Sequence, residues 1–234
     1  ELLLLWRTDG RAGMQSMMKA VGVLFLLLIM GCSAEETDFS ASSAALTVSV
    51  EQGLVEGIQS PFKHSSGLPV TVFRGLPYAQ PPVADLRWRP PVAPASWQGT
   101  RKADTFANSC YQPQHTSTFV WRREAFAVSE DCLYLNIWTA DTTKKQPVMV
   151  WFHGGAHTGG RAQVEVFDGT ELARKGVIVV TVNYRLGPLG FLAHPALAQE
   201  SEHNSSGNYG LMDKISALKW VQENIQAFGG DANN

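Results

Sequence analysis

The stretch PVMVWF (147–152), followed directly by HGGAHTGG (153–160), decides the fold that we expect for this chain. A continuous apolar run of this length is typical of a central strand that is buried on both faces. A second such run, VIVVTVNY, lies at 177–184, and DGTELARKG (168–176) separates the two. The order strand, short helix, strand predicts a right-handed parallel crossover.

The connecting segment carries the signals of a short helix. Asp168 or Thr170 can serve as the N-cap, because their side-chain oxygens can accept a hydrogen bond from the first free backbone N–H groups. Gly176 suits the C-terminal stop, where a left-handed conformation is common.

Further strands are predicted upstream. LTVSVEQGLVEGIQS (46–60) alternates apolar and polar residues on both sides of Gln52-Gly53, which indicates an antiparallel hairpin at a sheet edge. VTVFRG (70–75) and LYLNIWTA (133–140) are also strand candidates. We therefore expect an α/β fold with a central, mostly parallel sheet and an N-terminal antiparallel hairpin.

A long helix is predicted to begin near Tyr209, because apolar residues recur from there at spacings of three and four. We expect this apolar stripe to pack on the sheet and the helix to end at Gly229 and Gly230. The stripe consists of Leu211, Ile215, Leu218, Val221, Ile225 and Phe228.

Composition argues against a nucleic-acid partner. The 234 residues are 44% hydrophobic and 17% charged, and their formal net charge is −2. Lys and Arg are scattered and balanced by acids, so there is no basic stripe to replace the counterions of a phosphate backbone.

The N-terminal segment reads as a targeting signal. We expect residues 1–13 to be upstream or non-native sequence and 14–31 to be a signal peptide, because the apolar run 20–30 is too short to span a bilayer. LIMGC resembles a bacterial lipobox, which makes Cys32 the candidate lipidation site and 32–45 a flexible tether. The alternative is a plain secretory signal. A cell-envelope lipoprotein is therefore expected, or otherwise a periplasmic or secreted protein.

Export also bears on the two other cysteines. In an oxidising compartment Cys110 and Cys132 can form a disulfide, whereas in the cytosol two buried free thiols would be the ordinary interpretation.

The glycine-rich stretch has several possible functions. A phosphate-binding loop would need Gly-Lys-Ser/Thr, but Gly160 is followed by Arg161 and Ala162. His153 and His157 have the spacing of a helical metal pair, yet two glycines between them oppose a helix. We expect no metal site. A structural turn and an oxyanion hole for acyl transfer both remain open.

Five blocks, in order, resemble the type-B carboxylesterase and cholinesterase family, whose members have the α/β-hydrolase fold. They are FRGLPYAQPPVADLRWRPP (73–91), SEDCLYLNIW (129–138), WFHGGAHTGG (151–160), VNYRLGPLGFL (182–192) and GNYGLMDKISALKWVQENIQAFGGDANN (207–234).

The resemblance implies that the backbone N–H groups of Gly155 and Ala156 form the oxyanion hole and that Gly154 shapes the turn. It implies a small-molecule ester substrate, no cofactor, and no membrane contact except through a lipid at Cys32. Ala156 stands where many members carry glycine, and His157 stands where an aromatic residue is common. We expect His157 to bear on specificity.

The resemblance also implies structural pairings. Cys110–Cys132 matches the family disulfide, and Arg87–Glu130 and Arg185–Asp213 resemble structural ion pairs rather than the triad acid. Trp121 is interpreted as a surface aromatic. None of the chain's histidines is expected to be the general base, namely His64, His115, His153, His157, His194 and His203.

The nucleophile of the family is not found in these 234 residues, because they contain no Gly-x-Ser-x-Gly turn. We expect 46–234 to be the N-terminal portion of a carboxylesterase domain, truncated before this elbow, and to be inactive by itself. The complete protein is expected to be a serine carboxylesterase that works through an acyl-enzyme. The alternative is a catalytically inactive relative used for binding or adhesion.

Overall fold

The computed structural model describes residues 46–63, 69–113 and 126–234. The predictions for 1–13, 14–31, 32–45 and Cys32 lie outside these residues and stay predictions, as do those for His64, His115 and Trp121. The compact unit Ser43–Asn234 contains all the described residues. Within the described ranges, no helix is long and apolar enough to cross a membrane.

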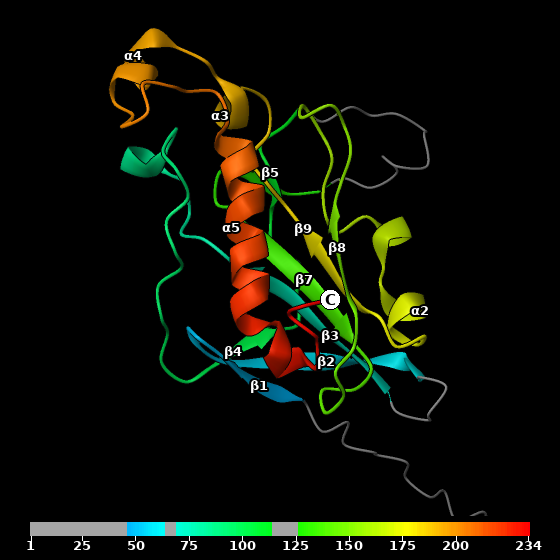
Figure 1. Cartoon of the computed structure of the whole chain (residues 1–234). Coiled ribbons are helices and arrows are strands. Elements are labelled where there is room, and N and C mark those ends of the chain that lie inside the picture. The colour runs from blue at the N-terminus through cyan, green and yellow to red at the C-terminus, as the bar shows by residue number, and fades with distance from the viewer. Residues whose placement is uncertain (1–45, 64–68, 114–125) are drawn as a thin grey trace, which may run out of the picture. The chain divides into compact units, whose positions relative to one another are not determined.

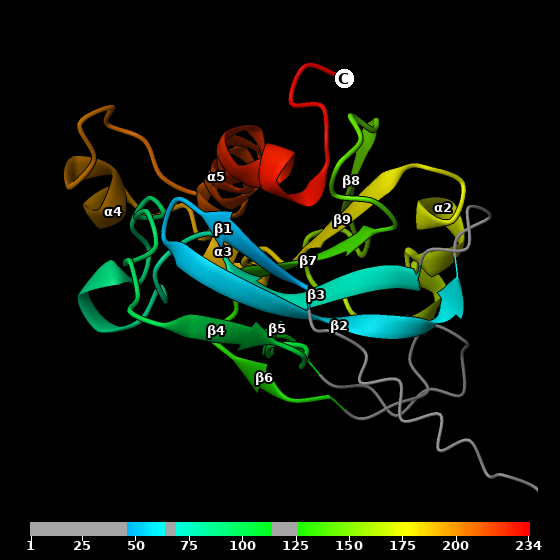
Figure 2. The same ribbon diagram turned by 90° about the horizontal axis from the view of Figure 1, so that it is seen from below.

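A mixed sheet forms the centre of this unit, in the order β1-β2-β3-β7-β9-β8, with β4 paired to β2 (Figure 1). Its strands are β1 (Thr47–Val50), β2 (Gly53–Lys63), β3 (Pro69–Pro77), β4 (Thr100–Ala103), β7 (Tyr134–Thr139), β8 (Val148–Phe152) and β9 (Ile178–Val182). Viewed from below, β1 and β2 lie at one side and β8 and β9 at the other (Figure 2). A second sheet consists of β5 (Ser109–Cys110) and β6 (Val128–Ser129).

The predicted hairpin and crossover are both present. β1 and β2 pair antiparallel with Val50 opposite Gly53, and the turn between them is Glu51-Gln52. β8 and β9 pair parallel across α2 (Thr170–Ala173). Gly169 is the N-cap of α2 rather than Asp168 or Thr170, although the Asp168 carboxylate accepts a hydrogen bond from the Thr170 N–H at 2.9 Å.

The expectation of a mostly parallel sheet is wrong for the described strands. In the central sheet the pairs β1–β2, β2–β3, β3–β7 and β7–β9 are antiparallel, and β8–β9 and β2–β4 are parallel; the separate pair β5–β6 is also parallel. A continuous apolar run indicates that a strand is buried on both faces, as β7 and β9 are. It does not indicate strand direction, because antiparallel strands that are covered on both faces have the same pattern as parallel ones.

Two helices cover opposite faces of the sheet. Because side chains alternate along a strand, Ile137 of β7 lies in the larger core cluster with α5 (Tyr209–Asn224), whereas the neighbouring Trp138 lies in the smaller cluster with Ala173 of α2. Figure 1 shows α5 running along the strands, and it continues into the short turn η4 (Ile225–Phe228). Within the described ranges, the remaining helical segments are η1 (Ala84–Leu86), η3 (Glu165–Phe167), α3 (Gly187–Phe191) and α4 (Pro195–Gln199).

The apolar stripe predicted on α5 is only half buried. Val221, Ile225 and Phe228 pack in the core, but Leu211, Ile215 and Leu218 are 41%, 54% and 46% exposed. The buried face of the helix includes polar residues, and on it lie Tyr209, Asp213, Ala217, Trp220 and Asn224, together with Val221. Asp213 and Asn224 have hydrogen-bond partners in the core, and a pattern of hydrophobicity alone does not register them.

β8 also differs from the sequence expectation of a strand buried on both faces. It is the last strand in the sheet order, and Met149 and Trp151 on it are exposed. Trp151 contacts the ring of Phe167 in η3, with the ring centroids 5.3 Å apart. The expectation was correct for β9, in which every residue is buried.

Candidate active site

The glycine turn, residues 153–160, follows β8 directly. Its shape comes from one carbonyl oxygen: that of Gly155 accepts hydrogen bonds from the N–H groups of Thr158 at 3.0 Å and Gly159 at 3.2 Å. The Thr158 hydroxyl donates to the same oxygen at 3.1 Å. These three bonds close a tight turn at the end of the strand.

The backbone of the turn is left-handed at successive residues. Gly155, Ala156 and His157 have φ angles of +121°, +51° and +62°. A Cβ on Gly155 would lie 1.9 Å from the carbonyl oxygen of Gly159, so only glycine fits there. Ala156 and His157 are non-glycine residues in a conformation that is uncommon for them, and such conformations cluster at functional sites.

The turn presents two free donors. Among the described residues, the backbone N–H groups of Gly155 and Ala156 donate no hydrogen bond. Both residues are exposed, as is Gly154 before them. Two adjacent unpaired N–H groups held by a fixed turn can bind a negatively charged oxygen.

His153 supports the turn from below. The buried ring of His153 stacks on Tyr184 with centroids 4.5 Å apart, and its Nδ1 lies 3.0 Å from the Gly154 carbonyl oxygen. The Tyr184 hydroxyl donates a hydrogen bond to the backbone carbonyl oxygen of His153 at 2.8 Å. Burial lowers the pKa of His153 to about 4; the bond to Gly154 opposes the shift and the Lys214 cation adds to it. The ring is therefore neutral at pH 7 and packed rather than free for proton transfer.

His157 lies at the exposed tip of the glycine turn. Its ring stacks on Phe191 of α3 with centroids 4.4 Å apart and planes 4° from parallel. Its carbonyl oxygen accepts a hydrogen bond from the Gly187 N–H at 2.7 Å, which ties the tip to the start of α3. In the part of the chain that the structure describes, no three His, Cys, Asp or Glu side chains are grouped closely enough to hold a metal ion.

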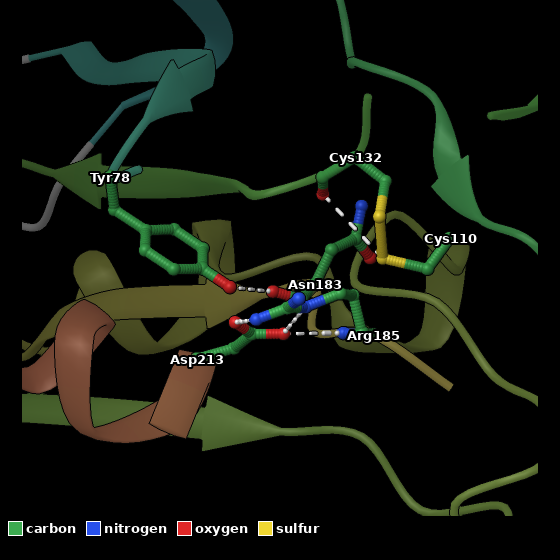
Figure 3. Close-up of polar contacts among 6 residues, drawn as sticks. All are labelled: Tyr78, Cys110, Cys132, Asn183, Arg185 and Asp213. Carbon is green, nitrogen blue, oxygen red and sulfur yellow. Dashed lines mark hydrogen bonds and ion pairs between the residues drawn. A yellow bond between two sulfur atoms is a disulfide. The ribbon is translucent and has the colours of Figure 1, made fainter. Parts of the chain in front are cut away.

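Arg185 and Asp213 form a buried ion pair (Figure 3). The guanidinium donates to the two carboxylate oxygens at 2.8 and 2.7 Å, and the backbone N–H of Arg185 donates at 3.0 Å. Burial raises the pKa of Asp213, although the bonds and charge of Arg185 oppose the shift. Beside this pair the Tyr78 hydroxyl donates to the Asn183 carbonyl at 2.7 Å, and burial raises the pKa of Tyr78. Asp213 thus fastens α5 to the segment that follows β9.

The second expected ion pair is present nearer the surface. Arg87 donates through Nε and Nη2 to the two carboxylate oxygens of Glu130 at 2.5 and 2.6 Å. These hydrogen bonds, and then the charge of Glu130, raise the pKa of Arg87. Cys110 and Cys132 form the predicted disulfide, which Figure 3 shows close to Arg185.

Sequence reasoning missed three amide side chains that join the segment 107–112 to the segment 160–163. Gln112 bonds to both backbone groups of Gly160, Gln163 donates to the Ala107 carbonyl and the Ser109 hydroxyl, and Asn183 accepts from the Ala162 N–H and donates to the Asn108 carbonyl. No local pattern marks these residues, because their partners lie 21 to 75 positions away.

Comparison with known proteins places these features in a family. The model of the Carboxylesterase family matches residues 44–234. Fumonisin B1 esterase of Sphingopyxis macrogoltabida is 44% identical over 220 residues, which cover 93% of this chain and 39% of that protein.

Two further relatives match at similar identity. Cholinesterase of Mus musculus is 41% identical over 217 residues, which cover 89% of this chain and 33% of that protein. Para-nitrobenzyl esterase of Bacillus subtilis is 43% identical over 189 residues, which cover 80% of this chain and 36% of that protein. The chain thus spans well under half the length of each relative. The family match extends over nearly all described residues, and the chain belongs to the carboxylesterase family.

Proposed function

We propose that this chain supplies the oxyanion-binding side of a serine carboxylesterase and that the complete protein hydrolyses small-molecule carboxylic esters. The observation that carries the proposal is the pair of unpaired N–H groups on Gly155 and Ala156, exposed on a turn that its own hydrogen bonds hold in place. Fumonisin B1 esterase and para-nitrobenzyl esterase are named for ester hydrolysis, which supports the same class of reaction here.

In the proposed reaction a serine hydroxyl attacks the ester carbonyl while a histidine accepts its proton. The carbonyl oxygen becomes negatively charged, and the N–H groups of Gly155 and Ala156 donate hydrogen bonds to it. The alcohol leaves, and water releases the acid from the acyl-enzyme. Because the 234 residues contain no Gly-x-Ser-x-Gly turn, we propose that the rest of the protein supplies the serine, and with it the histidine and the acid.

The buried contacts described above keep the donors in place for this role. The neutral His153 ring and Tyr184 pack under the turn, and the bond from Gly187 holds its tip. A donor that is fixed before the charge develops needs no reorganisation in the transition state, which is why such groups are effective. The exposed stack of His157 on Phe191 lies beside the donors, and we propose that it borders the substrate.

The test uses the complete reading frame and hydrolysis of p-nitrophenyl acetate. Ala156→Pro removes one donor N–H and also forces the turn away from its φ of +51°, because the proline ring fixes φ at about −65°; the two effects together should lower kcat by about 100-fold or more. Ala156→Gly is the matched control, because glycine keeps the N–H and accepts a φ of +51° without strain. This control should retain most of the activity, and the 234-residue chain by itself should hydrolyse no ester.

Three results would count against the proposal. Wild-type rates in Ala156→Pro would exclude the donor role, and a residue other than serine in the elbow would favour the inactive, binding relative. Hydrolysis by the 234-residue chain that is lost in Gly155→Pro would show that the chain carries its own nucleophile.

Expression of the complete protein in cells also tests where the protein is located. We propose that the protein is exported and held at a membrane by a lipid on Cys32. Wild-type protein should then sediment with membranes and incorporate labelled palmitate, whereas Cys32→Ala should do neither. Unchanged labelling of Cys32→Ala would exclude the anchor.

A further inference from the structure

We propose that Gln112 is a positioning residue that holds the glycine turn in the geometry its oxyanion donors need. The inference rests on the proposed function of that turn and assigns a role to a side chain in a different part of the chain. Gln112 lies two residues after Cys110, in the segment that the Cys110–Cys132 disulfide ties to the start of β7.

The Gln112 amide makes three hydrogen bonds. Its Oε1 accepts from the Gly160 N–H at 2.8 Å, and its Nε2 donates to the Gly160 carbonyl at 2.7 Å. Nε2 also donates to the Cys110 carbonyl at 3.0 Å. The side chain therefore satisfies both backbone groups of Gly160, as a neighbouring strand would, and links them to a backbone that a disulfide already restrains.

Gly160 in turn packs against His153 and Gly154, the two residues that directly precede the donors. A Cβ on Gly160 would be 2.3 Å from His153 Nδ1 and 2.4 Å from the Gly154 carbonyl oxygen. There is thus no free space between Gly160 and these atoms, and a shift of Gly160 toward them displaces Gly154 or the His153 ring. The other end of the turn is held by β8 and its tip by Gly187, and Gln112 holds Gly160 at the downstream end.

The two hydrogen bonds between Gln112 and the Gly160 backbone determine the cost of losing this side chain. Replacing Gln112 with leucine leaves the Gly160 N–H and carbonyl without their partner, and they must find water or move. A displacement of about 1 Å in a group that stabilises a transition state can cost about 100-fold in rate. Such a displacement affects substrate binding much less, because the ground-state carbonyl carries little negative charge.

Gln163 offers a matched control. Its Nε2 donates to the Ala107 carbonyl at 3.1 Å and to the Ser109 hydroxyl at 2.6 Å. It therefore joins the same two segments with the same type of side chain, but it makes no hydrogen bond to the glycine turn. Gln163→Leu should reproduce the general loss of stability without the loss of positioning.

The experiment compares wild-type, Gln112→Leu and Gln163→Leu forms of the complete protein. Active sites are titrated with an organophosphate, so that kcat refers to folded enzyme only, and kcat and KM are measured with p-nitrophenyl acetate. We expect Gln112→Leu to lower kcat by about 10-fold to 100-fold with KM within about twofold of wild type. Gln163→Leu should keep both constants near wild type.

Amide hydrogen exchange measures how firmly the glycine turn is held, and it does not depend on enzyme activity. The N–H groups of Thr158, Gly159 and Gly160 are hydrogen bonded, so peptides covering 153–160 should exchange faster in Gln112→Leu than in wild type or Gln163→Leu. In an active enzyme, equal kcat values for the two variants would overturn the proposal. If the wild-type protein hydrolyses no ester, the proposed function fails instead. Equal exchange in the two variants would then show that Gln112 does not hold the turn.

Discussion

Arg185–Asp213 and Arg87–Glu130 are the same arrangement in two different surroundings: a guanidinium that donates two hydrogen bonds to a carboxylate. The side chains of the inner pair are 3% and 0% exposed, whereas those of the outer pair are 39% and 23% exposed. The distances alone give the outer pair the shorter bonds. Burial, rather than bond length, sets how much the chain depends on each pair.

The inner pair joins two elements within the core. Asp213 lies on α5, and Arg185 follows β9 and precedes α3. Removing one partner leaves the other charge buried and without compensation. At the outer pair, water and salt replace a lost partner at little cost.

The largest effect is expected from Asp213→Ala. It should lower the free energy of unfolding by about 3–5 kcal/mol, because the Arg185 charge remains buried and unpaired. Denaturant unfolding of the chain measures this loss. The control is the double variant Arg185→Leu/Asp213→Leu, which leaves no unpaired charge and should be more stable than Asp213→Ala. A loss from Asp213→Ala no larger than that from Glu130→Ala would contradict the comparison.

His153 is a further buried ionisable group, and its pKa predicts how stability depends on pH. Burial lowers the pKa of His153 to about 4 from its ordinary value of 6.5. The unfolded chain therefore binds more protons than the folded chain between pH 4 and 6.5. The stability that His153 contributes is complete above pH 6.5 and is lost as the pH falls to 4. The difference in unfolding free energy between wild type and His153→Gln should shrink by about 3 kcal/mol across this window.

Measurement of denaturant unfolding at several pH values checks this prediction. Between pH 7.5 and 9 the difference between wild type and His153→Gln should be constant, because the imidazole is neutral in both the folded and the unfolded chain. A difference that is also constant from pH 6.5 down to 4 would mean that His153 charges in the folded protein without penalty.

The sequence was most informative where the pattern of burial is local. The hairpin at Gln52-Gly53, the crossover between β8 and β9 and the position of α5 follow from alternation, apolar runs and helical spacing. Strand direction did not follow, because β7 pairs antiparallel with β9 and is nevertheless buried on both faces.

The buried face of α5 was misassigned for a related reason. Asp213 and Asn224 are buried because each finds partners far along the chain, Arg185 for one and the Glu51 N–H for the other. In the candidate site, the family resemblance supplied Gly155 and Ala156 and both ion pairs. It did not supply Gln112, whose role depends on a contact with Gly160 across 48 positions.

The smallest effect is expected at the outer pair. Glu130→Gln keeps the shape of the side chain and removes its charge, and the loss of stability should be less than about a fifth of that caused by Asp213→Ala. The Arg87 guanidinium then contacts water, since it is already partly exposed. In 1 M salt the effect of Glu130→Gln should fall further, because the Debye length is then about 3 Å, whereas the effect of Asp213→Ala should change little. Denaturant unfolding with urea at two salt concentrations measures both. Equal losses for the two variants, or a loss for Glu130→Gln that salt does not reduce, would show that the outer pair is shielded from water as the inner pair is.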